Sequence, residues 1–133
     1  MKYTALNWPA TRWPSFSHKE MRCSHCGECE VDPQMMDELQ EVRDTVGFPL
    51  KITSGYRCPQ HPVEAAKEAP GSHTYGKAVD IAVDRGKAFA VLQAALVAFT
   101  GIGIKQHGGG RFLHLDTMEN GGRWFRKTIW SYK

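Results

Sequence analysis

Two short segments with alternating side chains constrain this fold more than any other part of the sequence. The first, KAVDIAV over residues 77–83, alternates branched apolar residues with two alanines and Asp80. The second, RFLHLDT over residues 111–117, places Phe112, His114 and Asp116 on one face and two leucines on the other. Because successive side chains of a strand point to opposite faces, each segment predicts a strand with one apolar face and one face of ligand-type groups.

Cap signals predict the helices of the N-terminal half. Ser17 and Glu20 have capping-box spacing, which predicts a short helical turn that ends before Cys23. Asp32 before Pro33 predicts the start of a helix that ends at Gly47. The segment LKITSG, residues 50–55, is typical of a strand, and residues 56–76 are expected to form a long loop.

The C-terminal half predicts one further helix and the rest of the sheet. Asp84 is positioned to cap a helix whose apolar face is formed by Phe89, Leu92, Leu96 and Phe99. The segment GIGI, residues 101–104, and the second alternating segment predict an antiparallel pair joined by KQHGGG. A last strand is expected within RWFRKTIW, residues 123–130. This order predicts an α+β fold with a small, mostly antiparallel sheet and flanking helices.

Length and charge limit the organisation and the partners. We expect a single domain over residues 1–133, with an irregular segment at 1–30, and a monomer. The net charge of +3 is too small to indicate nucleic acid and only weakly favours an acidic polymer such as a cell wall. The apolar run AFAVLQAALVAF is too short for membrane insertion. The first residues lack an apolar signal region, so we expect synthesis in the cytoplasm without a signal peptide.

The two alternating segments also supply the residue types of a metal site. His73, Asp80 and His114, with Asp116 as a further candidate, can converge if the strands are neighbours. Two imidazoles and one carboxylate leave an open position on Zn²⁺, which is the catalytic pattern. Simpler roles remain open from the residues alone, because His73 can hydrogen-bond a turn and Asp80 can pair with Lys77 or Arg57.

A second cluster of metal-binding residues lies in CSHCGEC, with one distant cysteine. The four residues of this cluster are Cys23, Cys26, Cys29 and Cys58. They predict a second, structural zinc, with His25 as a replacement for one thiolate, that would pin the N-terminal segment to the loop of Arg57. Disulfides formed after export and free thiols remain alternatives. An iron–sulfur cluster is not expected, because the fourth cysteine is too distant.

The motif SHTYGKAVD fits the pattern Ser-x-His-x-x-Gly-x-Ala-x-Asp. It resembles the zinc D-alanyl-D-alanine carboxypeptidase and L-alanyl-D-glutamate endopeptidase family, whose superfamily includes lysostaphin-type peptidases and the hedgehog N-terminal domain. The flanking ITSGYRCP and FLHLDT are similar to those of small phage and bacterial members. The resemblance covers roughly residues 17–130 and implies a fold like that of these peptidases.

The resemblance implies roles for individual residues. His73, Asp80 and His114 would be the zinc ligands. Arg57 would bind substrate and stabilise the oxyanion, or form an ion pair with Asp80 or Asp116, and Ser72 would contact substrate.

The general base departs from the family pattern. Arg111 stands where many members carry a carboxylate, and Phe112 stands where others carry a histidine. Asp116, as base or as a residue orienting a ligand, and His107 are the remaining candidates.

The resemblance implies a zinc-dependent peptidase that hydrolyses bacterial peptidoglycan stem peptides, as a carboxypeptidase or an endolysin-type endopeptidase. Because no signal peptide is recognised, a phage lysis or virion-associated enzyme that acts on the cell wall after release is expected. The alternative is a non-catalytic binding or virion structural module on the same scaffold, where the metal stabilises the fold. Arg57 and the open zinc position favour the enzyme, and Arg111 favours the alternative.

Overall fold

The computed structural model describes residues 1–119 and 126–133, which form a five-stranded sheet with helices on both sides. The strands, in their order across the sheet, are β1 (Lys51–Ser54), β2 (Ala78–Ala82), β4 (Phe112–Asp116), β3 (Gly101–Lys105) and β5 (Thr128–Ser131). All neighbouring pairs are antiparallel except β3 and β5, which are parallel. This architecture confirms the predicted α+β fold with a mostly antiparallel sheet.

Three of the four helices begin where the cap residues Ser17, Asp32 and Asp84 predict. The four helices are α1 (His18–Met21), α2 (Pro33–Val46), α3 (Pro62–Ala65) and α4 (Arg85–Ala95). Ser17 and Glu20 form the capping box of α1. The carboxylate of Asp32 accepts a hydrogen bond from the amide of Met35 at the start of α2. That helix ends at Gly47, whose φ of 75° lies in the left-handed region that favours glycine.

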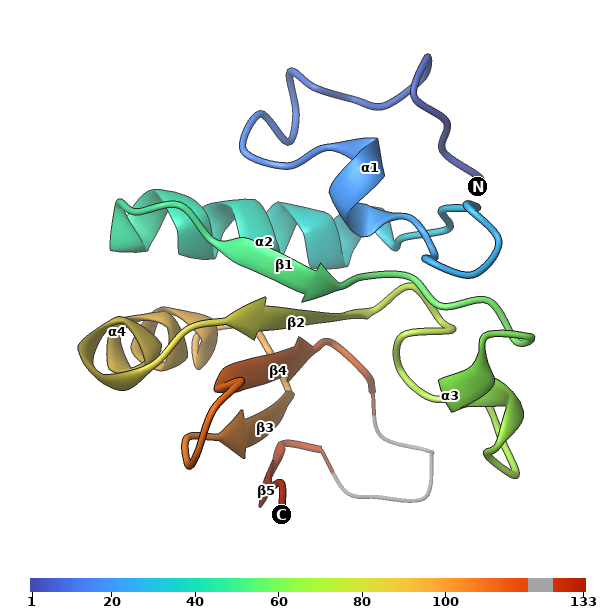
Figure 1. The fold of residues 1–133 in the computed structure, drawn as a ribbon. Helices are drawn as coiled ribbons and strands as arrows, with labels where there is room; N and C mark the ends of the chain where they lie inside the picture. The colour runs from blue at the N-terminus through green and yellow to red at the C-terminus, as the bar shows by residue number, and fades with distance from the viewer. Residues whose placement is uncertain (120–125) are drawn as a thin grey trace.

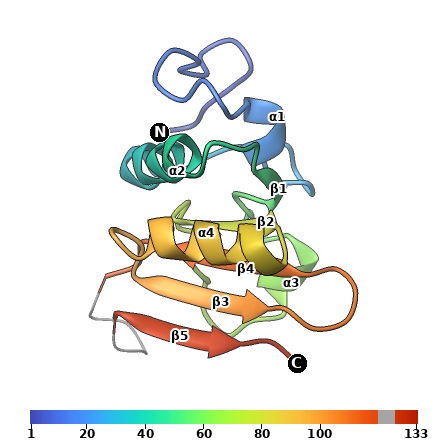
Figure 2. The ribbon, with the colours of Figure 1, turned by 90° about the vertical axis from the view of Figure 1, so that its left-hand side faces the viewer.

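The sheet separates two layers, one helical and one that contains the long loop. Helix α4 packs on β4 and against α2 on one face of the sheet, as Figure 2 shows. Helix α3 and its loop lie on the opposite side of the sheet in both views (Figures 1 and 2). The long loop and the polar faces of the central strands therefore share one side of the molecule.

The alternation predicted for the central strands is confirmed. Val79, Ile81, Leu113 and Leu115 are buried in the core beneath the helices. The other face of the same strands carries Asp80, His114 and Asp116. Register then aligns a cross-strand row of four residues on this face: Asp80 on β2, His114 on β4, Gly103 on β3 and Trp130 on β5.

The apolar face predicted for the fourth helix is wrong in two positions. Phe89 is 68% exposed and Leu96 is 57% exposed, whereas Ala88, Val91 and Ala95 are buried. Small side chains on the inner face let the backbone of α4 approach the sheet closely, and this outweighs the burial of the larger residues. Asp84 occupies the cap position of α4 without a side-chain hydrogen bond to the helix.

The N-terminal segment, the long loop and the last strand can also be compared with the predictions. Residues 1–30, which were expected to be irregular, contain the one-turn helix α1, and the side chain of Trp13 is fully buried. The predicted loop over residues 56–76 contains the short helix α3, which begins at a proline after His61. The predicted last strand is present as β5, while residues 123–125 of that prediction lie outside the described residues. In the described parts of the chain, helices of the length and apolarity needed to cross a membrane are absent.

Candidate metal centre

His73, Asp80 and His114 meet on the polar side of the sheet. His73 lies in the loop before β2, Asp80 lies in β2, and His114 lies opposite Asp80 in β4. Nδ1 of His114 is 3.0 Å from Oδ1 of Asp80, and Nε2 of His73 is 3.4 Å from the same oxygen. One ligand-type atom of each residue lies within 4.8 Å of the others, so the structure brings the predicted trio together.

The second nitrogen of each imidazole has its own hydrogen-bond acceptor. Nδ1–H of His73 donates to the carbonyl oxygen of Gly55 at 2.7 Å. Nε2–H of His114 donates to Oδ2 of Asp116 at 2.8 Å. We assign the protons to these nitrogens because the carbonyl and carboxylate oxygens are acceptors. The remaining nitrogens then face the carboxylate of Asp80, and a cation bound between them would be coordinated by both lone pairs and the carboxylate oxygen.

The donor set fits a zinc ion. Two imidazole nitrogens and one carboxylate oxygen are common zinc ligands, and bonds of about 2.0–2.1 Å in tetrahedral geometry place ligand atoms about 3.4 Å apart. The observed separations of 3.0 and 3.4 Å are close to this value. The acceptors behind His73 and His114 also match the usual support of metal-bound histidines. The three side chains thus have the chemistry and the spacing for one divalent ion.

The charges in the site favour a bound cation. Burial raises the pKa of Asp80, but hydrogen bonds with His114 and His73 outweigh burial and lower it below the ordinary value. Burial lowers the pKa of His114, but Asp116 and Asp80 more than compensate, so the pKa is raised. Asp80 is therefore ionised at neutral pH, and two carboxylates make the His114 ring a strong electron-pair donor.

Asp116 is buried behind His114. Its side chain is 1% exposed, and Oδ1 accepts from the amide of Met118 at 3.1 Å and pairs with Nη2 of Arg126 at 3.5 Å. Burial raises the pKa of Asp116, but the hydrogen bond with His114 lowers it to below the ordinary value. A side chain at Gly101, directly opposite in β3, would collide with this carboxylate. The geometry favours an orienting role for Asp116 over that of general base.

Arg57 closes one side of the site. Its Nε donates to Oγ of Ser54 at 3.0 Å, and Nη2 lies 3.4 Å from Oδ2 of Asp80. Nη1 pairs with Oε2 of Glu64 at 3.3 Å, and the arginine side chain remains 16% exposed. The ion pair with Asp80 that the sequence left open is present. Part of the Arg57 side chain thus remains accessible from the solvent.

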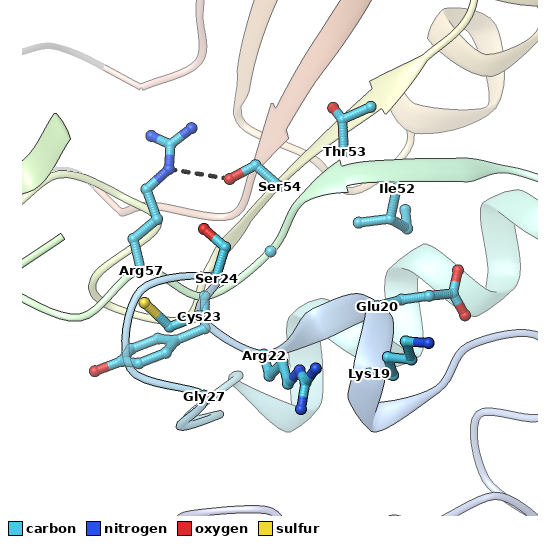
Figure 3. A pocket seen from close by; sticks show the side chains of 12 residues that line it. Lys19, Glu20, Arg22, Cys23, Ser24, Gly27, Ile52, Thr53, Ser54 and Arg57 are labelled. Atoms are coloured by element: carbon cyan, nitrogen blue, oxygen red, sulfur yellow. Dashed lines mark hydrogen bonds between the residues drawn. The ribbon is translucent and has the colours of Figure 1, made fainter. Parts of the chain in front are cut away.

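Arg57 also lines a cavity of about 530 Å³ between β1 and the segment around α1. Figure 3 shows Arg57 and Ser54 joined by their hydrogen bond at one end of this cavity and Lys19 at the other. Lys19, Glu20 and Arg22 give the cavity a polar, mainly cationic wall. A chain that reached the metal centre past Arg57 would find this space next to it.

Glu64 is a buried residue of the site that sequence reasoning missed. Its side chain is 1% exposed, and its carboxylate accepts from Lys67 Nζ at 3.0 Å and from the amide of Gly71 at 3.1 Å. The hydroxyl of Thr74 donates to the same carboxylate at 3.1 Å. Burial raises the pKa of Glu64, but Lys67 and the other donors lower it to about 2. Glu64 thus ties the loop that carries His73 to Arg57.

Of the remaining residues considered in the sequence analysis, Ser72 lies in the site, and His107 and Arg111 lie outside it. The hydroxyl of Ser72 lies 3.4 Å from Nε2 of His114, inside the site. His107 is exposed beyond the end of β3, and its Nε2–H donates to the carbonyl oxygen of Tyr132 at 3.1 Å. Arg111, next to it in the same loop, donates to the carbonyl oxygen of Gly108 at 3.0 Å. The structure brings Ser72 to the trio and engages His107 elsewhere.

Trp130 is a second residue of the site that the sequence did not indicate. Its ring lies 5.1 Å from the His114 ring, centroid to centroid. Gly103 separates them in the cross-strand row, and a side chain there would come within 2.7 Å of the Trp130 indole nitrogen. The only sequence signal was glycine at alternate positions in GIGI, which leaves space above β3 on the polar face.

The cysteine prediction is corrected from four residues to three. The sulfur atoms of Cys23, Cys26 and Cys58 lie within 4.8 Å of one another. Cys29 is fully buried in the hydrophobic core, where its backbone bridges to Tyr3. The alternation of the backbone after the CSHC turn directs Cys29 away from the other three.

At Gly76, the loop that carries His73 comes close to the start of α2. Its φ of 71° lies in the left-handed region, and its carbonyl oxygen accepts from the amide of Asp32 at 2.8 Å. A Cβ at this position would collide with the backbone of Glu30 and Val31. The motif glycine is therefore needed for backbone packing beside the site.

The fold and the trio define a class: an α+β domain whose central strands present a candidate His–Asp–His metal site. A family model described as Peptidase M15 matches residues 14–116, and the chain belongs to this family. It is accordingly a metallopeptidase by family, with His73, Asp80 and His114 as its candidate metal site. No curated protein matches the chain significantly.

Proposed function

We propose that this chain is a zinc-dependent peptidase that hydrolyses peptide bonds in the stem peptides of bacterial peptidoglycan. One observation carries the zinc site: two imidazole nitrogens face one carboxylate oxygen, at 3.0 and 3.4 Å, while the other nitrogen of each ring has its own oxygen partner. Three protein ligands leave a fourth position for water or substrate, as in catalytic zinc sites.

The residues around the trio support hydrolysis. When bound, zinc supplies a Lewis acid and lowers the pKa of water to about 7. Arg57 is held by Ser54 and Glu64 beside Asp80, so its charge is in place before substrate arrives. Such a preorganised donor stabilises the oxyanion that forms as the peptide carbonyl is attacked. Asp116 orients His114, and Ser72 is placed to contact the bound peptide.

The choice of substrate rests on the family resemblance and on charge. Stem peptides carry free carboxylates, and the cavity beside Arg57 has Lys19 and Arg22 in its wall. Cations at these positions would attract such a peptide and orient it toward the trio. We further propose a phage-related lysis or virion-associated role, with action on the cell wall after release. Both carboxypeptidase and endopeptidase activity are compatible with this site.

A non-catalytic binding module is the second candidate. It is favoured by Arg111, which replaces the family carboxylate, and by the engagement of Asp116 with His114, Met118 and Arg126. On this alternative the metal would stabilise the loop of His73, and peptidoglycan would bind without being cut.

Digestion of purified peptidoglycan separates the two candidates. Wild-type protein with zinc is expected to release new amino termini, and free D-alanine would identify carboxypeptidase action. His73→Ala should abolish the release, whereas His107→Ala should retain it because His107 bonds to Tyr132 outside the trio. Co-sedimentation with peptidoglycan without new amino termini, in zinc-loaded wild-type protein, would establish the binding module instead.

A further inference from the structure

A second group of metal-binding side chains lies apart from the His–Asp–His trio. It consists of Cys23, Cys26 and Cys58, which we call the thiol cluster. Cys23 and Cys58 are 1% and 4% exposed, whereas Cys26 lies at the surface. Two segments far apart in the chain therefore bring three sulfur atoms to one point with one side open to solvent.

The first two cysteines belong to a tight turn that brings their sulfur atoms close together. The amide of Gly27 donates to the carbonyl oxygen of Cys23 at 2.8 Å, and the amide of Cys23 donates to that of Glu28 at 2.7 Å. Gly27 has a φ of 79°, while the space around its α-carbon is open. Glycine is therefore required at this position by the backbone of the turn and not by packing.

Backbone amides point at the sulfur atoms. Cys23 Sγ accepts from the amides of Cys58 at 3.3 Å and His25 at 3.4 Å, and Cys26 Sγ accepts from that of Glu28 at 3.5 Å. Amide donors stabilise thiolates, and outer hydrogen bonds of this kind hold metal ligands in place. The cluster thus has both the ligands and the support around them.

A disulfide accounts for the geometry less completely. Three thiols form at most one disulfide and leave one sulfur unpaired, and Cys29 lies outside the group. A metal ion uses all three sulfur atoms. Zinc–sulfur bonds of about 2.3 Å place tetrahedral thiolates about 3.8 Å apart, within the spread of the cluster.

We propose that Cys23, Cys26 and Cys58 bind a zinc ion as three thiolates, with the fourth position on the exposed side of Cys26. Thiolates select soft or borderline cations over magnesium or calcium. The site is distinct from the peptidase trio, and its occupancy is measurable whether or not the chain cleaves peptidoglycan.

The location of the thiol cluster indicates what such an ion would do. Cys58 directly follows Arg57, and the amide of Tyr56 donates to the carbonyl oxygen of Met21 at the end of α1 at 2.9 Å. Figure 3 shows Cys23 at the wall of the cavity that Arg57 also lines. An ion here would fasten the end of α1 to the loop that presents Arg57 to Asp80.

Metal content of the full chain is the first test. Wild-type protein purified with zinc should hold two ions, and His73→Ala should hold one. Cobalt substitution of His73→Ala should give the intense near-ultraviolet thiolate-to-cobalt band. A His73→Ala protein without zinc and without this band, or a disulfide between two of the three cysteines in the purified protein, would overturn the proposal.

Two alanine variants form a matched pair. Cys26→Ala in the His73→Ala background should lose the remaining zinc and the cobalt band, although it removes only an exposed thiol. Cys29→Ala in the same background should keep both, although it removes a buried side chain. Unfolding followed with and without a chelator should show a shift of the midpoint for Cys29→Ala and none for Cys26→Ala. Equal metal content in the two variants would refute the site.

Discussion

The two donor clusters of this chain are built in contrasting ways. Asp80 and His114 lie on adjacent strands, in register, with His73 in the loop directly before β2. The thiol cluster instead joins a turn after α1 to a loop after β1, and one of its members is exposed. The sheet therefore positions the trio. The thiol cluster, in contrast, would hold the two loops it joins in place.

Arg57 lies between the two clusters and shows how they are connected. Its guanidinium contacts Asp80, and its backbone continues directly into Cys58. The difference indicates a division of roles: the sheet positions the candidate metal ligands Asp80 and His114, and the loops position the guanidinium of Arg57 beside them.

The largest effect is expected from a change within the trio. His73→Ala should reduce peptidase activity by more than about 1000-fold, because loss of one electrostatic partner alone costs about 100- to 1000-fold. Release of new amino termini from peptidoglycan measures this loss. The cobalt spectrum of the thiol cluster should stay unchanged, and its disappearance would show that the clusters are not independent.

A change at Arg57 should have the next largest effect. Arg57→Lys retains the charge but loses the planar group that contacts Ser54, Glu64 and Asp80. We expect kcat/KM to fall by about 100-fold with zinc content unchanged. Wild-type kinetics in this variant would mean that Arg57 only neutralises Asp80.

The orienting role of Asp116 predicts a smaller loss. Asp116→Asn keeps the size of the side chain but removes the charge behind the His114 ring. Zinc affinity should fall by about 10- to 100-fold, as for other residues that support a metal ligand. Competition with a chromophoric chelator measures the affinity. An activity loss with unaltered zinc affinity would instead identify Asp116 as the general base.

Glu64→Gln tests, through acid stability, how strongly Glu64 holds the loop of His73 to Arg57. The pKa of Glu64 falls from its ordinary 4.5 to about 2 in the folded protein, because Lys67 and the other donors outweigh burial. Its contribution to the free energy of unfolding, about 3 kcal/mol, is present above pH 4.5 and is lost as pH falls toward 2.

Urea unfolding of wild type and Glu64→Gln, at neutral pH and near the lower end of this range, measures that contribution. The wild type should be the more stable protein at neutral pH, and the difference should shrink in acid. Titrations common to both proteins cancel in the comparison. A difference that stayed constant with pH would show that the carboxylate charge of Glu64 contributes nothing to stability.

Local signals in the sequence predicted most of the fold. The cap residues Ser17 and Asp32 act within one turn of their helices, so sequence spacing alone locates α1 and α2. Strand alternation predicted the faces of β2 and β4 because the pleat has a fixed period. For α4 the period was not enough, because its sequence is apolar on more than one side and closeness of packing decided that Ala88 rather than Phe89 is buried.

The candidate site was predictable where its residues carry a motif and not where they depend on tertiary contacts. His73, Asp80 and His114 were found from spacing and residue type. Glu64 was missed because a glutamate in a polar loop is ordinarily exposed, and its burial depends on how the loop folds around it to bring Arg57 and Gly71 to its carboxylate. Trp130 was missed because β5 pairs with β3 in parallel, a pairing that no local signal announces.

The close packing of Gly76 against the backbone of Glu30 and Val31 has a consequence for variants of the SHTYGKAVD motif. A substitution at this glycine would disturb the fold and not the candidate ligands. Any side chain there would act as a wedge and push the entry of α2 off the loop that carries His73, although the substitution removes no ligand and no charge. If a variant of Gly76 is inactive, the reason would be that the loop of His73 has moved, although His73, Asp80 and His114 are all still present. Added metal would then not restore the activity.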